Sequence, residues 1–267
     1  MERLIELIKY LILSIVQGIG EVLPISSSGH SLLVRNVLGI EEGGVAIELT
    51  LHFASLLALF VYYRRTIFSL IKGCFGYAFY KDKTKERDFK FVRGMIISLI
   101  PTCLVGYFAN DYLDSFLKYP VYIGVFLVFN AINLYLIRRS ENTKKIEELG
   151  VLSFFKIGVG QCLGLVPGFS RSGSALSMCY REKLSKDDSE KFTFLMLFPL
   201  VIGSIILNIS DFSFSNDELL LLSISFIITF MITMFSIKLL NKIINNNKIH
   251  YFSYYCLVVG IIVMFLG

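Results

Sequence analysis

Charged side chains are scarce in this sequence. They make up 18% of its 267 residues, while 55% of the residues are hydrophobic and 14% are aromatic. A typical soluble domain has about 25% charged residues and about 45–50% apolar residues. Both values are shifted towards burial in lipid, which argues against a soluble enzyme, a disordered chain and a nucleic-acid-binding protein. The net charge of +5 is the one feature that suggests an anionic partner.

Cysteine is also sparse and follows no pattern. The chain has an odd number of cysteines with no C-x-x-C pair: Cys74, Cys103, Cys162, Cys179 and Cys256. This arrangement excludes both a disulfide framework and a zinc site of known spacing. We expect most of them to be small buried hydrophobic residues.

Long apolar stretches are abundant instead. A helix needs about 20 apolar residues, or about 17 at the least, to cross the hydrocarbon core of a bilayer. Six stretches qualify, at roughly 47–63, 91–109, 121–137, 192–208, 219–237 and 252–266. The N-terminal apolar run carries Glu6 and Lys9 and is followed by no small-residue cleavage site, so we interpret it as retained structure rather than a signal peptide. The sequence predicts an all-α polytopic membrane protein.

The positive charges predict the topology. Four segments, 64–93, 138–156, 181–191 and 238–250, hold 21 of the 26 lysine and arginine residues. The segments 39–46, 110–119 and 209–218 hold a single lysine and several acidic residues. The positive-inside rule places the first group in the cytoplasm and the second group outside. The net charge therefore reflects orientation and says nothing about the substrate.

This topology requires re-entrant segments. Residues 154–180 lie between two cytoplasmic segments, so they must enter the membrane and return as a hairpin. Residues 4–38 have the same short, broken character, and we expect them to form a second hairpin that enters from outside. Backbone of this kind is tolerated at membrane depth only where it is buried in protein or lines a wet cavity. The two hairpins therefore predict a central site.

An internal repeat supports the same arrangement. Residues 17–29 and 161–173 align without a gap at an offset of 144, and Gln17/Gln161, Gly20/Gly164, Val22/Val166, Ser26/Ser170, Ser28/Ser172 and Gly29/Gly173 are identical. We predict one domain over 1–267 with an inverted-topology repeat of about 1–140 and 145–267. Each half would hold one re-entrant hairpin and three transmembrane helices, with the broken helices meeting near the bilayer midplane.

Ionisable side chains break the repeat. Glu21, Ser27 and His30 are paired in the alignment with Leu165, Arg171 and Ser174. A charge within the membrane costs about 2.5 kcal/mol or more and faces a cavity or a partner. The differences between the two halves at these positions therefore indicate residues with a chemical role rather than a structural one.

The first motif gathers Glu21, Ser26, Ser27, Ser28 and His30 within ten residues. Each has a structural alternative, since a serine can cap a helix or bond to backbone inside a membrane, and a lone histidine can be a hydrogen-bonding core residue. Glu21 is the hardest to explain structurally, because its charge must be compensated.

The second motif offers that compensation. Arg171 carries a guanidinium group that matches phosphate or carboxylate oxygens with a fork of N–H donors. Gly168 and Gly173 permit close backbone approach, and Ser170 and Ser172 add hydroxyl groups at a helix start that favours anions. The alternative is a structural ion pair between Arg171 and Glu21. The combination fits an oxyanion pocket for phosphoryl transfer.

Two spans carry further polar residues. Glu48, His52 and Ser55 share one helix face, and we expect that face to line the cavity. Asn130 and Asn133 are better explained as hydrogen bonds between helices.

The two motifs QGIGEVLPISSSGH and PGFSRSG make the chain resemble the undecaprenyl-diphosphate phosphatase family, of the bacitracin-resistance type, over essentially its whole length. The resemblance implies an enzyme of the bacterial plasma membrane that hydrolyses undecaprenyl diphosphate to the monophosphate and inorganic phosphate. This reaction recycles the lipid carrier of peptidoglycan synthesis and confers bacitracin resistance. The resemblance also implies an active site open towards the outer face.

The family's functional residues correspond to Glu21, Ser27, His30 and Arg171. Ser26, Ser28, Gly168, Ser170, Ser172 and Gly173 are the expected substrate-binding neighbours. The resemblance further implies a divalent cation, Mg²⁺ or Ca²⁺, with Glu21 as a ligand. Many members have glutamate where this chain has Gln17, which puts a two-carboxylate metal site in doubt, and Gln17 or Glu48 would have to complete it.

A lipid transporter or flippase without hydrolysis is the alternative, because inverted repeats with broken helices are common in transporters. The expected partners are the polyprenyl diphosphate substrate and the bilayer, with no nucleic acid. The sequence marks no lipid-facing surface, and a homodimer is one state that it allows.

Overall fold

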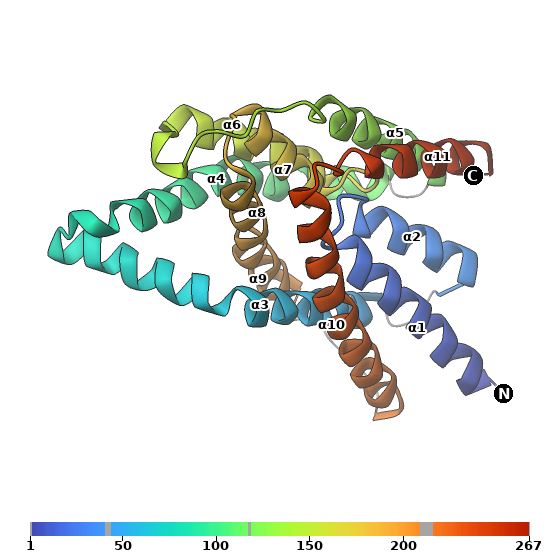
Figure 1. Ribbon diagram of the computed structural model, residues 1–267. Coiled ribbons are helices and arrows are strands. Elements are labelled where there is room, and N and C mark those ends of the chain that lie inside the picture. The colour runs from blue at the N-terminus through green and yellow to red at the C-terminus, as the bar shows by residue number, and fades with distance from the viewer. Residues whose placement is uncertain (1, 41–43, 117–118, 209–215, 267) are drawn as a thin grey trace.

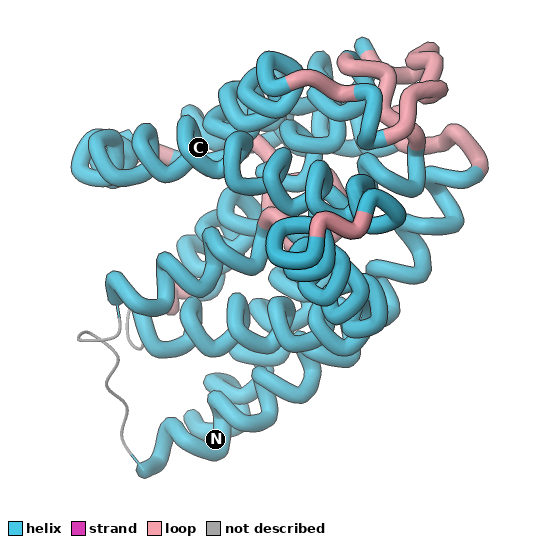
Figure 2. Tube along the Cα trace, turned by 90° about the vertical axis from the view of Figure 1, so that its left-hand side faces the viewer, coloured by secondary structure: helices cyan, strands magenta, loops and turns pink. Residues whose placement is uncertain are grey.

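The chain is helical throughout the part that the structure describes. The computed structural model describes residues 2–40, 44–116, 119–208 and 216–266, and these ranges contain no β-strand (Figure 2). The helices are α1 (Glu2–Gly20), α2 (Ser27–Leu38), α3 (Gly44–Tyr80), α4 (Glu86–Phe116), α5 (Pro120–Leu136), α6 (Val151–Gln161), α7 (Arg171–Arg181), α8 (Lys186–Leu195), α9 (Leu197–Asn208), α10 (Asn216–Asn245) and α11 (Tyr251–Leu266). Three short 3-10 helices accompany them, η1 (Lys83–Lys85), η2 (Ile146–Glu148) and η3 (Cys162–Leu165).

Four helical stretches of the described chain are long and apolar enough to cross a membrane. They are Ala46–Tyr80, Lys83–Phe108, Lys186–Ile206 and Glu218–Asn245. Three further apolar helices are shorter, at Pro120–Leu136, Val151–Leu165 and Tyr251–Leu266. The predicted spans 121–137 and 252–266 therefore correspond to α5 and α11, which are shorter than the other four. The prediction of an all-helical polytopic membrane protein is confirmed.

Helix ends differ from the predicted span ends for identifiable reasons. The apolar span 47–63 stops at Arg64, but α3 continues to Tyr80, because charge marks the edge of a bilayer and does not end a helix. The span 192–208 is broken at Met196 between α8 and α9. Pro199 lacks the N–H that would bond to Leu195, and its ring clashes with that carbonyl in a continuous helix.

Two helical hairpins surround the centre of the molecule. The first is α1–α2, whose open ends are joined by Lys9 Nζ donating to the Gly39 carbonyl at 3.5 Å. The second is α6–η3–α7, where Ser153 Oγ donates to Glu182 at 2.6 Å and Lys156 lies 3.4 Å from the same carboxylate. Both hairpins therefore begin and end at neighbouring points, with their turns directed inward.

Each hairpin packs against a long helix through the same kind of hydrogen bond. Thr102 Oγ1 on α4 donates to the Gly158 carbonyl on α6 at 3.2 Å. Thr229 Oγ1 on α10 donates to the Ser14 carbonyl on α1, also at 3.2 Å. Ser14 and Gly158 are 144 residues apart, which is the offset of the sequence motifs.

Helices α5 and α11 lie side by side at one edge (Figure 1). Their contact is close because glycines face each other. A Cβ on Gly124 would lie 2.7 Å from the Gly260 carbonyl oxygen, and a Cβ on Gly260 would lie 2.8 Å from the Gly124 carbonyl oxygen. Small residues at such contacts are the usual way in which membrane helices approach each other.

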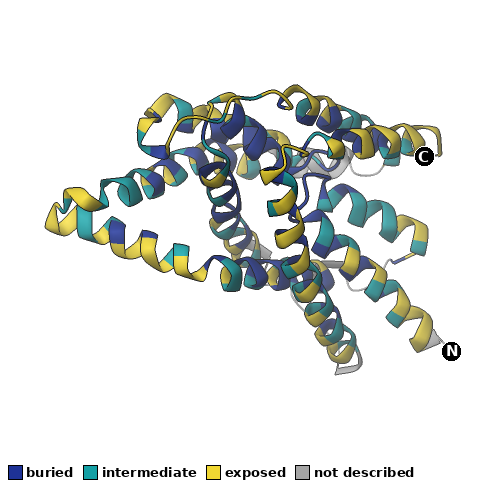
Figure 3. Cartoon of the chain, in the orientation of Figure 1, coloured by how far each residue is buried: buried dark blue, intermediate teal, exposed yellow. Residues whose placement is uncertain are grey.

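Buried residues gather near the centre of the molecule (Figure 3), and many of the exposed residues are large and apolar. Phe75, Phe108 and Phe235 are each more than half exposed. Exposed apolar surface on this scale marks contact with a membrane or a partner. All five cysteines are free, and two of them, Cys179 and Cys256, are fully buried, so the expected burial holds for less than half of them.

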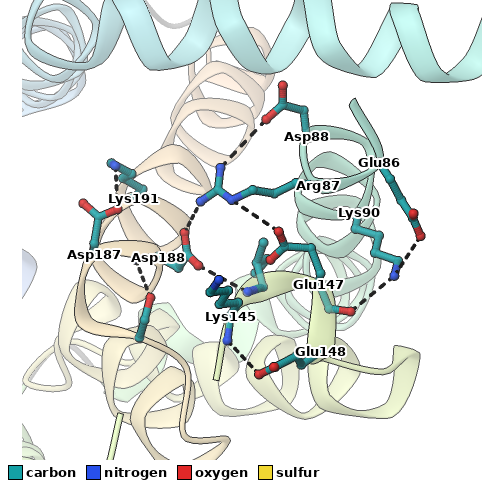
Figure 4. Close-up of polar contacts among 12 residues, drawn as sticks. Glu86, Arg87, Asp88, Lys90, Lys145, Glu147, Glu148, Asp187, Asp188 and Lys191 are labelled. Atoms are coloured by element: carbon teal, nitrogen blue, oxygen red, sulfur yellow. Dashed lines mark hydrogen bonds and ion pairs between the residues drawn. The ribbon is translucent and has the colours of Figure 1, made fainter. Parts of the chain in front are cut away.

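A polar network links three segments of high positive charge (Figure 4). Arg87 of α4 donates to Asp188 of α8 at 2.5 Å and lies 3.7 Å from Glu147 of η2. The backbone N–H of Ile146 donates to the other carboxylate oxygen of Asp188 at 3.2 Å. These residues belong to segments 64–93, 138–156 and 181–191, which therefore lie on the same side of the molecule.

Removing the arginine from this network should lower thermal stability. Asp188 is 4% exposed, and in Arg87→Gln its carboxylate loses a charged donor, at a cost of about 1.5–3 kcal/mol. Arg87 is 43% exposed, so solvent screening favours the lower end of that range. The measurement is the melting temperature in detergent. Lys191→Gln is the matched control, since it breaks only the exposed pair with Asp187; an equal loss in both variants would contradict the interpretation.

Candidate active site

The turns of the two hairpins enclose a cavity of about 170 Å³. The first hairpin contributes Glu21, Ser27 and Ser28, and the second contributes Ser170, Arg171 and Ser172. His52 of α3 and residues of α9 complete the wall. The structure thus brings together residues from the two motifs that the sequence analysis placed at one site.

Two helix starts converge on this cavity. Ser26 caps α2 by accepting from the Gly29 N–H at 3.2 Å, and Ser170 caps α7 by accepting from the Gly173 N–H at 3.1 Å. The residues that line the cavity occupy the first positions of each helix. The positive ends of two helix dipoles therefore face the same space, an arrangement that favours an anion.

A glycine lies against the start of each helix. A Cβ on Gly20 would lie 2.8 Å from Ser27 Cα, and a Cβ on Gly164 would lie 2.3 Å from Arg171 Cα. Each first helix can therefore end directly against the start of the second. Ser27 and Arg171 occupy equivalent places in the two hairpins, which brings a hydroxyl group and a guanidinium group to opposite sides of one cavity.

The two turns are also fixed to each other. Ser26 has a left-handed φ of 74°, and its hydroxyl oxygen accepts from the Gly168 N–H of the other hairpin at 3.0 Å. Asn130 on α5 donates to the Pro24 carbonyl at 2.9 Å and accepts from the Ser170 N–H at 3.4 Å. The prediction that Asn130 bonds between helices is confirmed, and its partners are the two turns that build the site.

Glu21 is the hub of the site. It is 4% exposed and accepts from Arg171 on Oε1 at 2.8 Å. Its Oε2 accepts from Ser27 at 2.9 Å and from the Gln17 amide at 2.9 Å. The buried carboxylate is therefore compensated by one cation and two neutral donors, and the predicted contact between Glu21 and Arg171 is confirmed.

Arg171 has unused capacity. Within the described chain its guanidinium makes one hydrogen bond, to Glu21, and 22% of its side chain is exposed. A guanidinium group has five N–H donors. The remaining donors can serve a phosphate group in the cavity, which an arginine committed to a purely structural pair could not do.

His52 lines the cavity, as its helix face predicted, and lies beside Glu21. Its Nδ1 is 3.4 Å from Glu21 Oε2 and 3.1 Å from the Gln17 amide nitrogen. A neutral ring can accept from Gln17 there, whereas a protonated ring would donate to Glu21. The helical spacing of Glu48, His52 and Ser55 is the sequence signal for this residue, whereas the motif itself contains only His30.

His30 points away from this cavity. Its Nδ1 donates to the Ser26 carbonyl at 2.9 Å, and its Nε2 accepts from the Tyr255 hydroxyl on α11 at 2.9 Å. The ring is also stacked on Tyr255. The Nε2 contact holds α2 to α11, whereas the Nδ1 contact stays within the start of α2. In the described geometry His30 does not line the cavity.

The remaining predicted residues divide into lining and packing positions. Ser28 lines this cavity and a neighbouring one of about 210 Å³ between α1, α2 and α3. Glu48 lines only the neighbouring cavity, where it lies 3.7 Å from Arg35, and Ser55 bonds to α10. Gly168 and Gly173 line neither cavity, because they lie where the two turns touch.

The donor set fits a divalent cation only if the substrate supplies most of its ligands. Within the described residues, no three histidine, cysteine or acidic side chains form a metal cluster. Glu21 is the single carboxylate in the cavity, and the carbonyl oxygen of Gln17 already accepts from Ser31 at 3.2 Å. Mg²⁺ commonly uses one or two carboxylates together with substrate phosphates, and Glu21 is the residue that would hold it.

Comparison with known proteins gives a consistent result. The family model described as bacitracin resistance protein BacA matches residues 10–262. A relative from Bacillus thuringiensis (strain Al Hakam) named "Undecaprenyl-diphosphatase 2" is 33% identical over 267 residues, with 99% of each chain covered. A relative from Shouchella clausii (strain KSM-K16) named "Undecaprenyl-diphosphatase 1" is 33% identical over 263 residues, covering 96% of this chain and 95% of the relative. A relative of the same name from Bacillus licheniformis is 34% identical over 97% of each chain.

Proposed function

The chain belongs to the bacitracin resistance protein BacA family, and we propose that it hydrolyses undecaprenyl diphosphate to undecaprenyl phosphate and inorganic phosphate. The observation that carries the proposal is the cavity in which Arg171, Ser27 and Glu21 meet at two helix starts. The named relatives match this chain over nearly their whole length and carry the name undecaprenyl-diphosphatase. None of those named here is a transporter.

The residues suggest a division of labour. The free donors of Arg171 and the two helix starts would bind the diphosphate oxygens and stabilise the charge that develops on them. Ser27 donates to Glu21, so the carboxylate can take the hydroxyl proton as Ser27 Oγ attacks the terminal phosphorus. The bridging P–O bond would break, undecaprenyl phosphate would leave, and water would then cleave the phosphoserine. The alternative is direct attack by a water molecule that Ser27 orients.

We propose Mg²⁺ or Ca²⁺ as the cofactor, with Glu21 as its ligand from the protein. A bound divalent cation neutralises phosphate charge and orients the two phosphoryl groups. In this chain the amide of Gln17 lies beside Glu21 and adds no charge. The cation would therefore be held mainly by the substrate.

We further propose an inverted-topology repeat with two re-entrant hairpins. It is supported by the paired hydrogen bonds of Ser14 and Gly158, by the paired caps Ser26 and Ser170, and by the joined ends of each hairpin. It is also supported by the contacts of Figure 4 between segments that the charge pattern assigns to the cytoplasm.

We propose that the enzyme lies in the bacterial plasma membrane with its active site open to the outer face. The neighbouring cavity extends along α2 and α3 to Arg35 and Glu48, towards the predicted outer segment 39–46. The catalytic cavity is lined by Val201 and Ile205 of α9, which leads towards the predicted outer segment 209–218. Both directions agree with access from outside.

The test is phosphate release by the purified protein in detergent. We expect wild-type protein to release inorganic phosphate from undecaprenyl diphosphate, to lose this activity on chelation of divalent cations, and to regain it when Mg²⁺ is added. Absence of release with Mg²⁺ or Ca²⁺ would refute the proposed hydrolysis. Release that chelation leaves unchanged would refute the proposed cofactor alone.

A further inference from the structure

A third hollow, larger than the two cavities described above, shares one lining residue with the catalytic cavity. It has a volume of about 420 Å³ and runs between α5, the α6–η3 segment and α7. Phe126, Phe129 and Ile132 form one wall, and Leu163 and Met178 form the opposite wall. We call this hollow the α5–α7 groove. Phe129, Ile132 and Leu163 are each about half exposed, so the groove is open on the apolar outside of the molecule.

The groove adjoins the catalytic cavity, which we also call the phosphate pocket, through a single side chain. Phe169 lines both hollows and is 8% exposed. It directly precedes Ser170 and Arg171, which face the phosphate pocket. The cavity proposed for the anionic head and the apolar groove therefore lie on either side of one side chain.

The far end of the groove is polar. Asn133 donates to Ser177 at 3.1 Å and accepts from Arg181 at 3.0 Å. Ten residues of α7 separate Arg181 from Arg171, a distance of about 15 Å along a helix. The groove thus has the length of a few isoprene units, with most of its lining apolar, and it ends where hydrogen-bonded side chains begin.

We propose that the α5–α7 groove binds the first isoprene units of the substrate's polyprenyl chain while the diphosphate occupies the pocket beside Arg171. This inference rests on the proposed function and adds to it the site that recognises the lipid. The position of Phe169 favours the polyprenyl chain as the occupant, because this side chain bounds both the phosphate pocket and the groove. Contacts between the chain and the apolar walls would contribute to substrate affinity through van der Waals packing, because lipid is as apolar as the groove.

A membrane phospholipid is the competing occupant. Its acyl chain could fill the same apolar walls with its phosphate near Arg181. Such a lipid would contribute to folding and not to the recognition of the substrate's chain length. The two occupants therefore predict different dependences on substrate length.

The experiment narrows the groove and varies the substrate. Leu163→Trp and Ile132→Trp each place a larger side chain in the groove from opposite walls. The substrates are undecaprenyl diphosphate and dimethylallyl diphosphate, which has a single isoprene unit. Val159→Trp is the matched control, since Val159 is 49% exposed on α6 and outside the groove.

We expect both groove variants to lower kcat/KM for undecaprenyl diphosphate by about tenfold or more, mainly through KM, since even one methylene in an apolar pocket changes kcat/KM by about 10- to 200-fold. Hydrolysis of dimethylallyl diphosphate, whose single isoprene unit reaches least far into the groove, should fall much less, and this activity also shows that the variants are folded. An equal loss for both substrates, or no loss for either, would overturn the proposal. If wild-type protein hydrolyses neither substrate, it is the proposed function that fails.

Discussion

Replacing Arg171 by lysine should lower kcat/KM for undecaprenyl diphosphate by about 100- to 1,000-fold, the cost of removing one donor that stabilises developing charge in a transition state. Lysine keeps the positive charge and its attraction to Glu21. Its compact ammonium group replaces a planar guanidinium group with five N–H donors. It therefore cannot bond to Glu21 and to two phosphate oxygens in the same fixed geometry. The measurement is the rate of phosphate release at several substrate concentrations.

The control for this prediction is Arg64→Lys. Arg64 is exposed and donates to the Val61 carbonyl at 2.6 Å, far from the cavity in sequence and absent from its lining. This variant should keep wild-type activity. Normal activity in Arg171→Lys would remove the argument for bidentate phosphate binding.

A second comparison separates catalysis from a structural ion pair. If Arg171 and Glu21 only neutralise each other, replacing both with glutamine removes two buried charges together, which is often neutral for stability. The double variant would then fold and hydrolyse substrate normally. We expect it to fold with a melting temperature near that of wild type and to be inactive, because the phosphate ligand and the proton acceptor are both gone.

The pairing of Glu21 with Arg171 could be predicted from sequence, whereas the position of His30 could not. Glu21 and Arg171 are each costly in a membrane and therefore need a partner, and the repeat placed them in equivalent turns. A histidine can satisfy both ring nitrogens with neutral groups. Which groups do so depends on how α11 packs on α2, and no local pattern encodes that packing.

The sequence predicted that Asn130 forms hydrogen bonds to other segments, but not which residues are its partners. Polar residues in membrane helices bond across helices, and Asn130 does so. Its contact with Pro24 and Ser170 depends on the depth at which α5 crosses the two hairpin turns. The α5–α7 groove was not visible in the sequence for the same reason, since its walls come from separate helices and are ordinary apolar residues.

Helix ends were the least predictable part of the fold. The apolar pattern located every span, because the bilayer selects for apolar length. It could not show that α3 extends to Tyr80, because a charged residue such as Arg64 interrupts the apolar pattern without ending the helix. The break at Met196 could have been found from Pro199, whose missing N–H interrupts a helix one turn earlier.

Replacing Ser27 by alanine should lower the rate of hydrolysis by about a thousandfold or more if the hydroxyl is the nucleophile. It lies 2.9 Å from Glu21 Oε2, at the first position of α2, and faces the cavity. If it only orients a water molecule, the loss should be nearer to about 100-fold. Ser55→Ala is the control, because it also removes a serine hydroxyl but one that bonds to Thr233 outside the cavity.

The size of the loss does not by itself identify the chemistry, so the intermediate must be sought directly. Wild-type protein is mixed with undecaprenyl diphosphate labelled at its terminal phosphorus and quenched in acid before turnover is complete. Label recovered as phosphoserine at residue 27 establishes covalent transfer, with Glu21 as the group that accepts the hydroxyl proton. Label found only in free phosphate at every quench time, with activity lost in Ser27→Ala, establishes attack by water. Full activity of Ser27→Ala would exclude Ser27 both as the nucleophile and as the group that orients the water. His52, which is 3.4 Å from Glu21, would then be the next residue to replace.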